Sequence, residues 1–303
     1  MTSGSRHAVF AGLHAAGCFV LPNPWDAGSA RMMAALGAKA LATSSAAHAF
    51  TLGRPDLGAV SRDEALAHAE AIVAATPLPV SGDFENGFAD DPDGVAETVR
   101  LAGGVGLSGC SIEDTQMVAG TPAYAADHAV ERIRAAVAAA RALGRPFVLC
   151  ARADGVMNGS YDLAEGIRRL QAFEAAGADV LYLPVPPGRV ELQAVLAAVT
   201  KPVNALAAGP LRDLTVPELA ALGVRRISTG SQIARLTHAA IRNAVTAMLG
   251  EGSFVPLLQA ASGDEIDALL ARGAEPGGRA GGQPPDPRVF EPKRNMNDAG
   301  EER

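Results

Sequence analysis

Two carboxylates, Asp83 and Glu85, directly follow the short apolar segment 78–80. Side chains two residues apart on a strand point to the same side, so both carboxylates can face one point just past the strand. Carboxylates held together repel each other and raise each other's pKa unless a cation lies between them. Hard oxygen ligands suit Mg²⁺ or Mn²⁺. The stretch therefore predicts a divalent metal site, although an acidic turn is the alternative, because Asp, Asn and Gly are common turn residues.

Polar side chains follow nearly every apolar segment of the chain. Glu113 ends one such segment and Arg152 ends another, so a further carboxylate and a guanidinium take places equivalent to that of Asp83. The planar fork of an arginine suits a carboxylate ligand, while an ion pair with Asp154 or Glu113 is the structural alternative. The other polar residues at such positions are Asn23, Asp26, Thr43, Ser44, Ser45, Asp114, Asn204, Thr229 and Ser231.

The positions of these side chains depend on eight expected strands, each followed by a helix. Strands alternating with helices indicate a parallel sheet, and eight units over about 250 residues fit a (β/α)8 TIM barrel. In a barrel the carboxyl ends of all strands meet at one face, where active sites lie. A doubly wound open sheet is the alternative, but no G-x-G-x-x-G follows the first strand. The expected strands are 18–21, 39–42, 78–80, 105–112, 146–151, 179–183, 202–206 and 226–228.

The composition is that of a globular protein with a large core. The 303 residues are 48% hydrophobic and 19% charged, and the net charge is −7. No basic block is present, so we expect no nucleic-acid partner. No apolar run is long enough to span a bilayer and the N-terminus lacks a secretory pattern, so we expect a cytoplasmic protein with no membrane partner. The expected domains are a catalytic barrel, 1–272, and a flexible Gly- and Pro-rich tail, 273–303.

Together these residues describe a site for a small 2-oxo acid or dicarboxylate. Arg152 would bind a substrate carboxylate, and residues 44–47 offer N–H groups and hydroxyls to an anion, or simply form a capping turn. Asp56 lies in a loop that could cover the site, unless it is only a turn residue. A divalent metal would stabilise an enolate while a bond to the neighbouring carbon breaks or forms. The expected metal-binding carboxylates are Asp83, Glu85 and Glu113.

Six motifs, in this order and spacing, resemble the isocitrate lyase/phosphoenolpyruvate mutase superfamily. The resemblance covers about residues 5–270 and is closest to the bacterial methylisocitrate-lyase-like members. The motifs are Asn23-Pro-Trp-Asp-Ala-Gly-Ser-Ala-Arg31, Ala42-Thr-Ser-Ser45, Leu52-Gly-Arg-Pro-Asp56, Gly82-Asp-Phe-Glu-Asn-Gly87, Ser111-Ile-Glu-Asp114 and Ala151-Arg-Ala-Asp154.

The resemblance implies a barrel whose helices are exchanged between subunits of a homodimer or homotetramer. It also implies Mg²⁺ at the strand ends and an enolate intermediate. By motif match, Ser45 and Ala46 would contact the substrate carboxylate through their backbone, and Asn204 would contact the substrate. The metal shell would comprise Asp56, Asp83, Glu85 and Glu113. The expected catalytic residues are Arg152, Glu113 and Asp56.

The chain departs from the superfamily in one loop that matters for the reaction. Lyases that split isocitrate or methylisocitrate carry a Lys-Lys/Arg-Cys-Gly-His loop, whereas residues 115–124 read TQMVAGTPAY. The phosphonate-forming mutases have a Trp where Thr43 stands and a Gly where Ala46 stands. We therefore expect an Mg²⁺-dependent lyase for a small 2-oxo or 2-hydroxy acid, which cleaves a C–C bond or decarboxylates. The alternatives are phosphonopyruvate hydrolase or mutase chemistry, and a non-catalytic barrel that binds an oxo acid.

Overall fold

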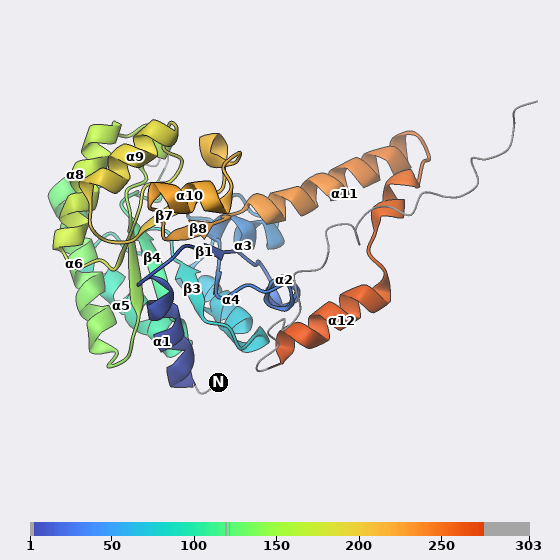
Figure 1. Ribbon diagram of the computed structural model, residues 1–303, viewed down its shortest axis with the longest axis horizontal. Helices are drawn as coiled ribbons and strands as arrows, with labels where there is room; N and C mark the ends of the chain where they lie inside the picture. The colour runs from blue at the N-terminus through green and yellow to red at the C-terminus, as the bar shows by residue number, and fades with distance from the viewer. Residues whose placement is uncertain (1–2, 119, 121, 276–303) are drawn as a thin grey trace, which may run out of the picture.

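The computed structural model describes residues 3–118, 120 and 122–275. Eight parallel strands form one sheet in the order β1-β8-β7-β6-β5-β4-β3-β2, so the strands from β2 to β8 lie in sequence order and β1 lies beside β8 (Figure 1). The strands are β1 Phe19–Leu21, β2 Leu41–Ala42, β3 Val80–Asp83, β4 Gly109–Glu113, β5 Val148–Arg152, β6 Val180–Tyr182, β7 Val203–Leu206 and β8 Arg226–Ser228.

The gap between β1 and β2 is closed by hydrogen bonds from the last residue of β2 and from the residues that follow β1. The Ala42 N–H donates to the Pro22 carbonyl at 3.1 Å, and the Asn23 side-chain amide donates to the Thr43 carbonyl at 2.8 Å. Closure removes the free edges that an open sheet would leave. The predicted TIM barrel is therefore confirmed, and the open-sheet alternative is wrong.

Helices cover the outside of the barrel (Figure 1). Two helices begin at side-chain caps: Asp26 caps α2, and Ser61 forms a capping box with Glu64 at the start of α4. Both satisfy N–H groups that the first helical turn leaves unpaired. The helices are α1 Ser3–Leu13, α2 Ala27–Ala35, α3 Ser45–Thr51, α4 Arg62–Ala75, α5 Pro92–Gly104, α6 Ala126–Ala142, α7 Gly155–Asn158, α8 Leu163–Ala175, α9 Arg189–Ala198, η1 Gly209–Leu211, α10 Val216–Leu222, α11 Gln232–Gly250, η2 Val255–Gln259 and α12 Gly263–Ala274.

Helix α1 covers the amino-terminal end of the barrel. Phe10 packs into the interior cluster that contains Phe19 and Val148, and His14 makes edge contacts with Phe10 and Phe19 at 4.9 and 5.1 Å between ring centroids. Burial, followed by the positive charge of Arg226, lowers the pKa of His14 from 6.5 to about 3. This imidazole is therefore neutral in the folded protein at neutral and mildly acidic pH.

This neutral histidine should make the protein less stable in mild acid. Below pH 6.5 the unfolded chain binds a proton at His14 that the folded chain does not bind, so the free energy of unfolding falls as pH is lowered. Between pH 8 and pH 5 a His14→Phe variant should lose about 2 kcal/mol less than the parent. Urea unfolding at both pH values measures the difference. Equal losses in the two proteins would contradict the assignment.

Helix α11 projects away from the barrel, and η2 and α12 follow it (Figure 1). In α11 the residue Ala234 is buried, while Leu236 and Leu249 are 71% and 83% exposed. Helix α12 returns to pack against α2, where Gly273 lies against the backbone of Arg31. Helix α12 thus runs to Ala274, two residues past the predicted domain boundary at 272. The rest of the predicted tail, 276–303, lies outside the described residues.

Among the described residues, no helix is both long and apolar enough to cross a bilayer. The longest helix, α11, has polar residues, among them Arg235, Arg242 and Asn243, between its exposed apolar side chains.

Candidate active site

Asp83, the last residue of β3, lies at the centre of the carboxyl-terminal face of the barrel. Its Oδ1 accepts hydrogen bonds from Arg152 Nη1 at 2.9 Å and Ser111 Oγ at 3.1 Å. Its Oδ2 accepts from the N–H and the hydroxyl of Ser45, both at 3.0 Å. The N–H of Asp83 donates to Thr43 Oγ1 at 2.8 Å. Arg152 of β5, Ser111 of β4 and Ser45 of α3 therefore fix this carboxylate in one orientation, and Thr43 fixes its backbone.

Arg152, the last residue of β5, joins three carboxylates. It pairs with Asp154 at 2.5 and 3.1 Å and with Asp83 at 2.9 Å, and Nη2 lies 3.5 Å from Glu113 Oε2. Burial acts to lower the pKa of Arg152, but Asp154, Glu113 and Asp83 raise it well above its ordinary value. The guanidinium also lies 5.2 Å from the ring centroid of Tyr182. The structural alternative for Arg152, an ion pair with Asp154 or Glu113, is confirmed. Binding of a substrate by the same residue stays a prediction.

Asp114 holds Asp154 in place and thereby helps to fix Arg152. One of its oxygens accepts the Asp154 N–H at 2.9 Å. The other accepts the Tyr161 hydroxyl at 2.8 Å and Arg169 Nη1 at 3.0 Å. Asp154 is therefore held by its backbone while its carboxylate holds Arg152, so the guanidinium has little freedom to turn.

Glu85 reaches the site in a way that differs from the prediction. Strand β3 ends at Asp83, and Glu85 has a φ of +47°, so the strand periodicity does not apply to it. Both carboxylates nevertheless line one small cavity. Glu85 is buried and accepts the Gly58 N–H at 3.2 Å with each oxygen. Burial, opposed by this hydrogen bond and reinforced by Asp83 and Asp56, raises its pKa to about 7.

Two further carboxylates, Glu113 and Asp56, interact with the charges of Asp83 and Arg152. Glu113, at the end of β4, is buried, and burial followed by Asp154 and Asp83 raises its pKa well above the ordinary value against the opposing charge of Arg152. Burial is also the main cause of the raised pKa of Asp56, to which the charge of Asp83 contributes. Asp56 Oδ1 is buried and has no hydrogen-bond partner in the described part of the chain. Asp56 therefore lies close enough to the site to interact with Asp83 and Ser45, and its role as a cover stays a prediction.

The structure places the remaining predicted binding residues around this centre. Ser45 and Ala46 are the first two residues of α3, and Ser44 is its N-cap, so residues 44–47 form the capping turn that was the alternative expectation. The donors of Ser45 are engaged with Asp83. Asn204 lies inside the barrel, where its amide donates to Ser228 Oγ at 2.9 Å and its carbonyl accepts Arg226 Nε at 2.8 Å.

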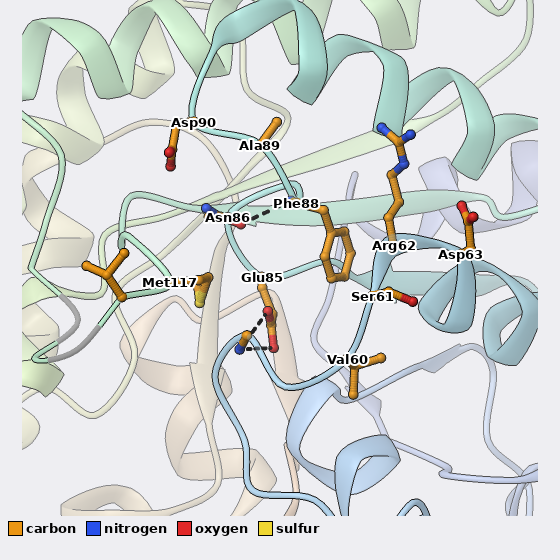
Figure 2. Close-up of a pocket in the computed structure, with 12 residues that line it drawn as sticks. Val60, Ser61, Arg62, Asp63, Glu85, Asn86, Phe88, Ala89, Asp90 and Met117 are labelled. Atoms are coloured by element: carbon orange, nitrogen blue, oxygen red, sulfur yellow. Dashed lines mark hydrogen bonds between the residues drawn. The ribbon is translucent and has the colours of Figure 1, made fainter.

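Two further pockets lie on either side of the small cavity lined by Asp83 and Glu85: one also contains Glu85 and the other Asp83. The outer pocket, about 540 Å³, lies between the loops that precede α4, α5 and α6, and Figure 2 shows Glu85 at its base with Met117 and Phe88 on either side. The inner pocket, about 50 Å³, is lined by Arg152, Asp83, Tyr182, Asn204 and Arg226 among others. The outer pocket could not be predicted from the sequence, because three loops far apart in the chain form it. Arg226 was not among the predicted site residues because it begins a strand, whereas those residues follow strands.

A divalent cation suits the charge of the site. Three carboxylates, those of Asp83, Glu113 and Asp154, form ion pairs with Arg152, and those of Asp56 and Glu85 interact with its charge at longer range. Asp83 already accepts four hydrogen bonds, whereas Asp56 carries an unpartnered oxygen. Within the described ranges, no three His, Cys, Asp or Glu side chains are arranged to hold a metal directly. A bound Mg²⁺ would therefore take most of its ligands from water, as this ion commonly does.

Known proteins share this architecture. The family model of phosphoenolpyruvate phosphomutase matches residues 10–249. A crystal structure from Burkholderia cenocepacia J2315, assigned to the lyase/mutase class, has a TM-score of 0.85 at 47% identity and covers 89% of this chain and 96% of that one. Oxaloacetate decarboxylase of Paraburkholderia xenovorans is 33% identical over 221 residues, which are 71% of each chain. 2,3-Dimethylmalate lyase of Eubacterium barkeri is 31% identical over 183 residues, 58% of this chain and 62% of that protein.

The family match includes every strand of the barrel and all the site residues described above. The predicted resemblance is thereby confirmed at the level of the superfamily, which also includes 2,3-dimethylmalate lyase. The relatives catalyse different reactions, so membership does not fix the substrate. The chain belongs to the phosphoenolpyruvate phosphomutase family, within the phosphoenolpyruvate mutase/isocitrate lyase superfamily.

Proposed function

We propose that this protein is an Mg²⁺-dependent lyase for a small 2-oxo or 2-hydroxy carboxylate, with decarboxylation of an oxaloacetate-like acid as the best-supported reaction. The observation that carries the proposal is the clustering of five carboxylates that pair with Arg152 or interact with its charge at one end of the barrel. Such a site suits a divalent cation together with an anionic substrate. The similarity to an oxaloacetate decarboxylase and a dimethylmalate lyase supports the same class of reaction.

The carboxylates of the site would hold the cation, and Arg152 would hold the substrate. Asp56, Asp83, Glu85 and Glu113 would hold Mg²⁺, in part through water. When bound, the ion would supply positive charge to stabilise negative charge on the 2-oxo group. The guanidinium of Arg152 has five N–H donors, of which its hydrogen bonds within the chain use three. The others are available to a substrate carboxylate.

The chemistry of the loop before α6 favours decarboxylation over an aldol-type cleavage. In decarboxylation the bond between the 3-carbon and its carboxylate breaks, CO₂ leaves, and the electron pair forms the enolate of the 2-oxo acid. A proton then adds to the 3-carbon. Cleavage of a 2-hydroxy acid additionally requires a base for the hydroxyl proton. Residues 115–118 contribute Met117 and Val118 to the outer pocket and contain no Cys, His or Lys.

The proposal is tested by turnover of a panel of acids with the purified protein. Oxaloacetate, 2,3-dimethylmalate, methylisocitrate and phosphonopyruvate are each supplied with Mg²⁺, and again after treatment with EDTA. We expect Mg²⁺-dependent release of pyruvate and CO₂ from oxaloacetate. Phosphate release from phosphonopyruvate would favour the alternative P–C chemistry. Binding of oxalate without turnover of any compound would indicate a non-catalytic barrel.

We further propose that the protein is a homodimer or homotetramer in which α11 packs on a partner subunit. Helix α11 and the following η2 expose large apolar side chains, including Leu236, Ile241, Leu249, Phe254 and Leu258. A set of this size on one projecting element is typical of a protein–protein interface. This arrangement would be the helix exchange that the resemblance implies.

Charged substitutions on α11 should dissociate this assembly. Ile241 and Leu249 are 60% and 83% exposed in the single chain, so replacing both with Asp should leave the subunit folded while it removes apolar contact at the interface. Light scattering coupled to gel filtration should give the mass of a dimer or tetramer for the parent and that of a monomer for the double variant. Asn243→Asp, at an exposed polar position of the same helix, is the control. A parent protein that is monomeric would contradict the proposal.

A further inference from the structure

Arg226 places a second guanidinium inside the barrel. It is the first residue of β8 and pairs in register with Asn204 on one side and Phe19 on the other. The side chain is buried and lines the inner pocket that Arg152 also lines. Arg152 is neutralised by three carboxylates. The charged partners of Arg226 can be compared with these three.

The contacts of Arg226 are all with neutral groups. Its Nε donates to Asn204 Oδ1 at 2.8 Å and Nη2 donates to Cys150 Sγ at 2.9 Å. Nη1 is buried and has no hydrogen-bond partner among the described residues. Burial raises the pKa of the Cys150 thiol above its ordinary value, so this partner does not supply a negative charge. His14, whose pKa is lowered by burial and by the charge of Arg226, is neutral as well.

A buried cation without a counter-charge is unfavourable, and proteins avoid it by pairing the cation. Here no carboxylate of the described chain forms an ion pair with Arg226, whereas Asp83, which lines the same pocket, is paired with Arg152. The free Nη1 therefore marks a place where an external anion would be favourable. An arginine fork with one unused arm suits a small oxyanion.

The inner pocket limits the size of that anion. Its volume of about 50 Å³ holds a few waters, a carboxylate group or a halide. Polar donors other than Arg226 line it, among them Tyr182 and Ser228. Ser228 Oγ lies 2.9 Å from the Asn204 amide, so its hydroxyl hydrogen can turn toward a ligand.

We propose that Arg226, together with Asn204 and Ser228, binds one small monovalent anion inside the barrel, beneath Arg152. The chemistry recognised is a carboxylate group or an ion of similar size. It comes either from one end of a carboxylate substrate that extends into the barrel or from a free ion in solution. The existence of this subsite does not depend on the reaction proposed above.

Formate is the probe, because it is a single carboxylate group. The protein, treated with EDTA, is titrated with formate by calorimetry at constant ionic strength, and its melting temperature is followed in parallel. We expect saturable binding with a rise in melting temperature. Arg226→Met keeps much of the side-chain volume but removes the charge and should weaken formate binding roughly tenfold or more. The control is Arg225→Met, because Arg225 is the exposed neighbour on the same segment and donates to the Gly17 carbonyl.

The melting temperature without formate separates an anion site from a purely structural arginine. If Arg226 is an unpaired cation, Arg226→Met should melt at the same temperature as the parent or higher in formate-free buffer. A large fall in melting temperature, together with parent binding that does not respond to formate, would overturn the proposal. Formate binding that is unchanged in Arg226→Met would also overturn it, because the ligand would then sit on Arg152. Should Arg226→Met not fold, Arg226→Lys, which keeps the charge, is measured in its place and should bind formate more weakly than the parent.

Competition identifies the source of the anion. If formate and a carboxylate substrate exclude each other, and KM rises in Arg226→Met while kcat changes little, the substrate supplies the carboxylate. If formate and substrate bind together, and chloride replaces formate, the site serves a free ion. Either result supports the subsite. Formate can be titrated whether or not a turned-over substrate is found, so failure of the subsite and failure of the proposed reaction can be told apart.

Discussion

Replacing Asp83 with asparagine should lower kcat/KM for the carboxylate substrate about 10³-fold, the scale typical for loss of one fixed electrostatic group at a reaction centre. Asn has the same shape but no charge, and one of its two terminal groups is a donor. Both Asp83 oxygens accept two hydrogen bonds each, from Arg152 and Ser111 and from Ser45. The amide group would therefore face donors, and Arg152 would lose one of its counter-charges. Steady-state kinetics over a range of Mg²⁺ concentrations measures the loss.

The Asp83→Asn result is meaningful only if the barrel stays folded. Asp93 is exposed in the first turn of α5, outside the site, and Asp93→Asn is the matched control, with activity expected within twofold or so of the parent. Urea unfolding should show that both variants remain cooperative. Activity of Asp83→Asn within a factor of about three would exclude this carboxylate from the reaction.

The barrel could be predicted because each unit repeats the same local pattern. Apolar segments short enough for strands alternate with helices whose caps are visible in the sequence, as with Asp26 at α2 and Ser61 with Glu64 at α4. Helix α3 was missed because its seven residues, Ser45–Thr51, are too few to show a helical period. For its N-cap, Ser44, the sequence favours an anion-binding turn and a helix-capping turn equally, and the structure has the capping turn.

The centre of the site could also be predicted, since it depends on strand order alone. Strands β3, β4 and β5 are neighbours and Glu113 pairs in register with Arg152, so residues at their ends must meet. The positions of Glu85 and Arg226 could not be predicted in this way. Glu85 depends on a left-handed backbone conformation and on Gly58 from a distant loop, and Arg226 depends on which buried partners happen to be neutral.

Replacing Arg152 with lysine should lower kcat/KM about 10²-fold or more, although the charge is kept. The guanidinium spans Asp83 and both oxygens of Asp154, with Glu113 within 3.5 Å. A single ammonium group on a flexible stem cannot contact all three carboxylates and a substrate carboxylate at the same time. The loss should therefore appear in KM, through weaker substrate binding, and in kcat, because Asp83 is no longer held in one orientation. Steady-state kinetics separates the two.

Chemical rescue separates this functional role of Arg152 from a merely structural one. In an Arg152→Ala variant, added guanidinium ion can refill the space between Asp83 and Asp154, and it should restore a measurable part of the activity while added ammonium restores less. Arg168→Lys is the matched control, because Arg168 pairs with Glu165 at the surface and is 66% exposed. Its activity should equal that of the parent, since exposed ion pairs contribute little. If lysine at position 152 supports full activity, or if guanidinium and ammonium act alike, the fork geometry of Arg152 has no part in the reaction and only its charge is required.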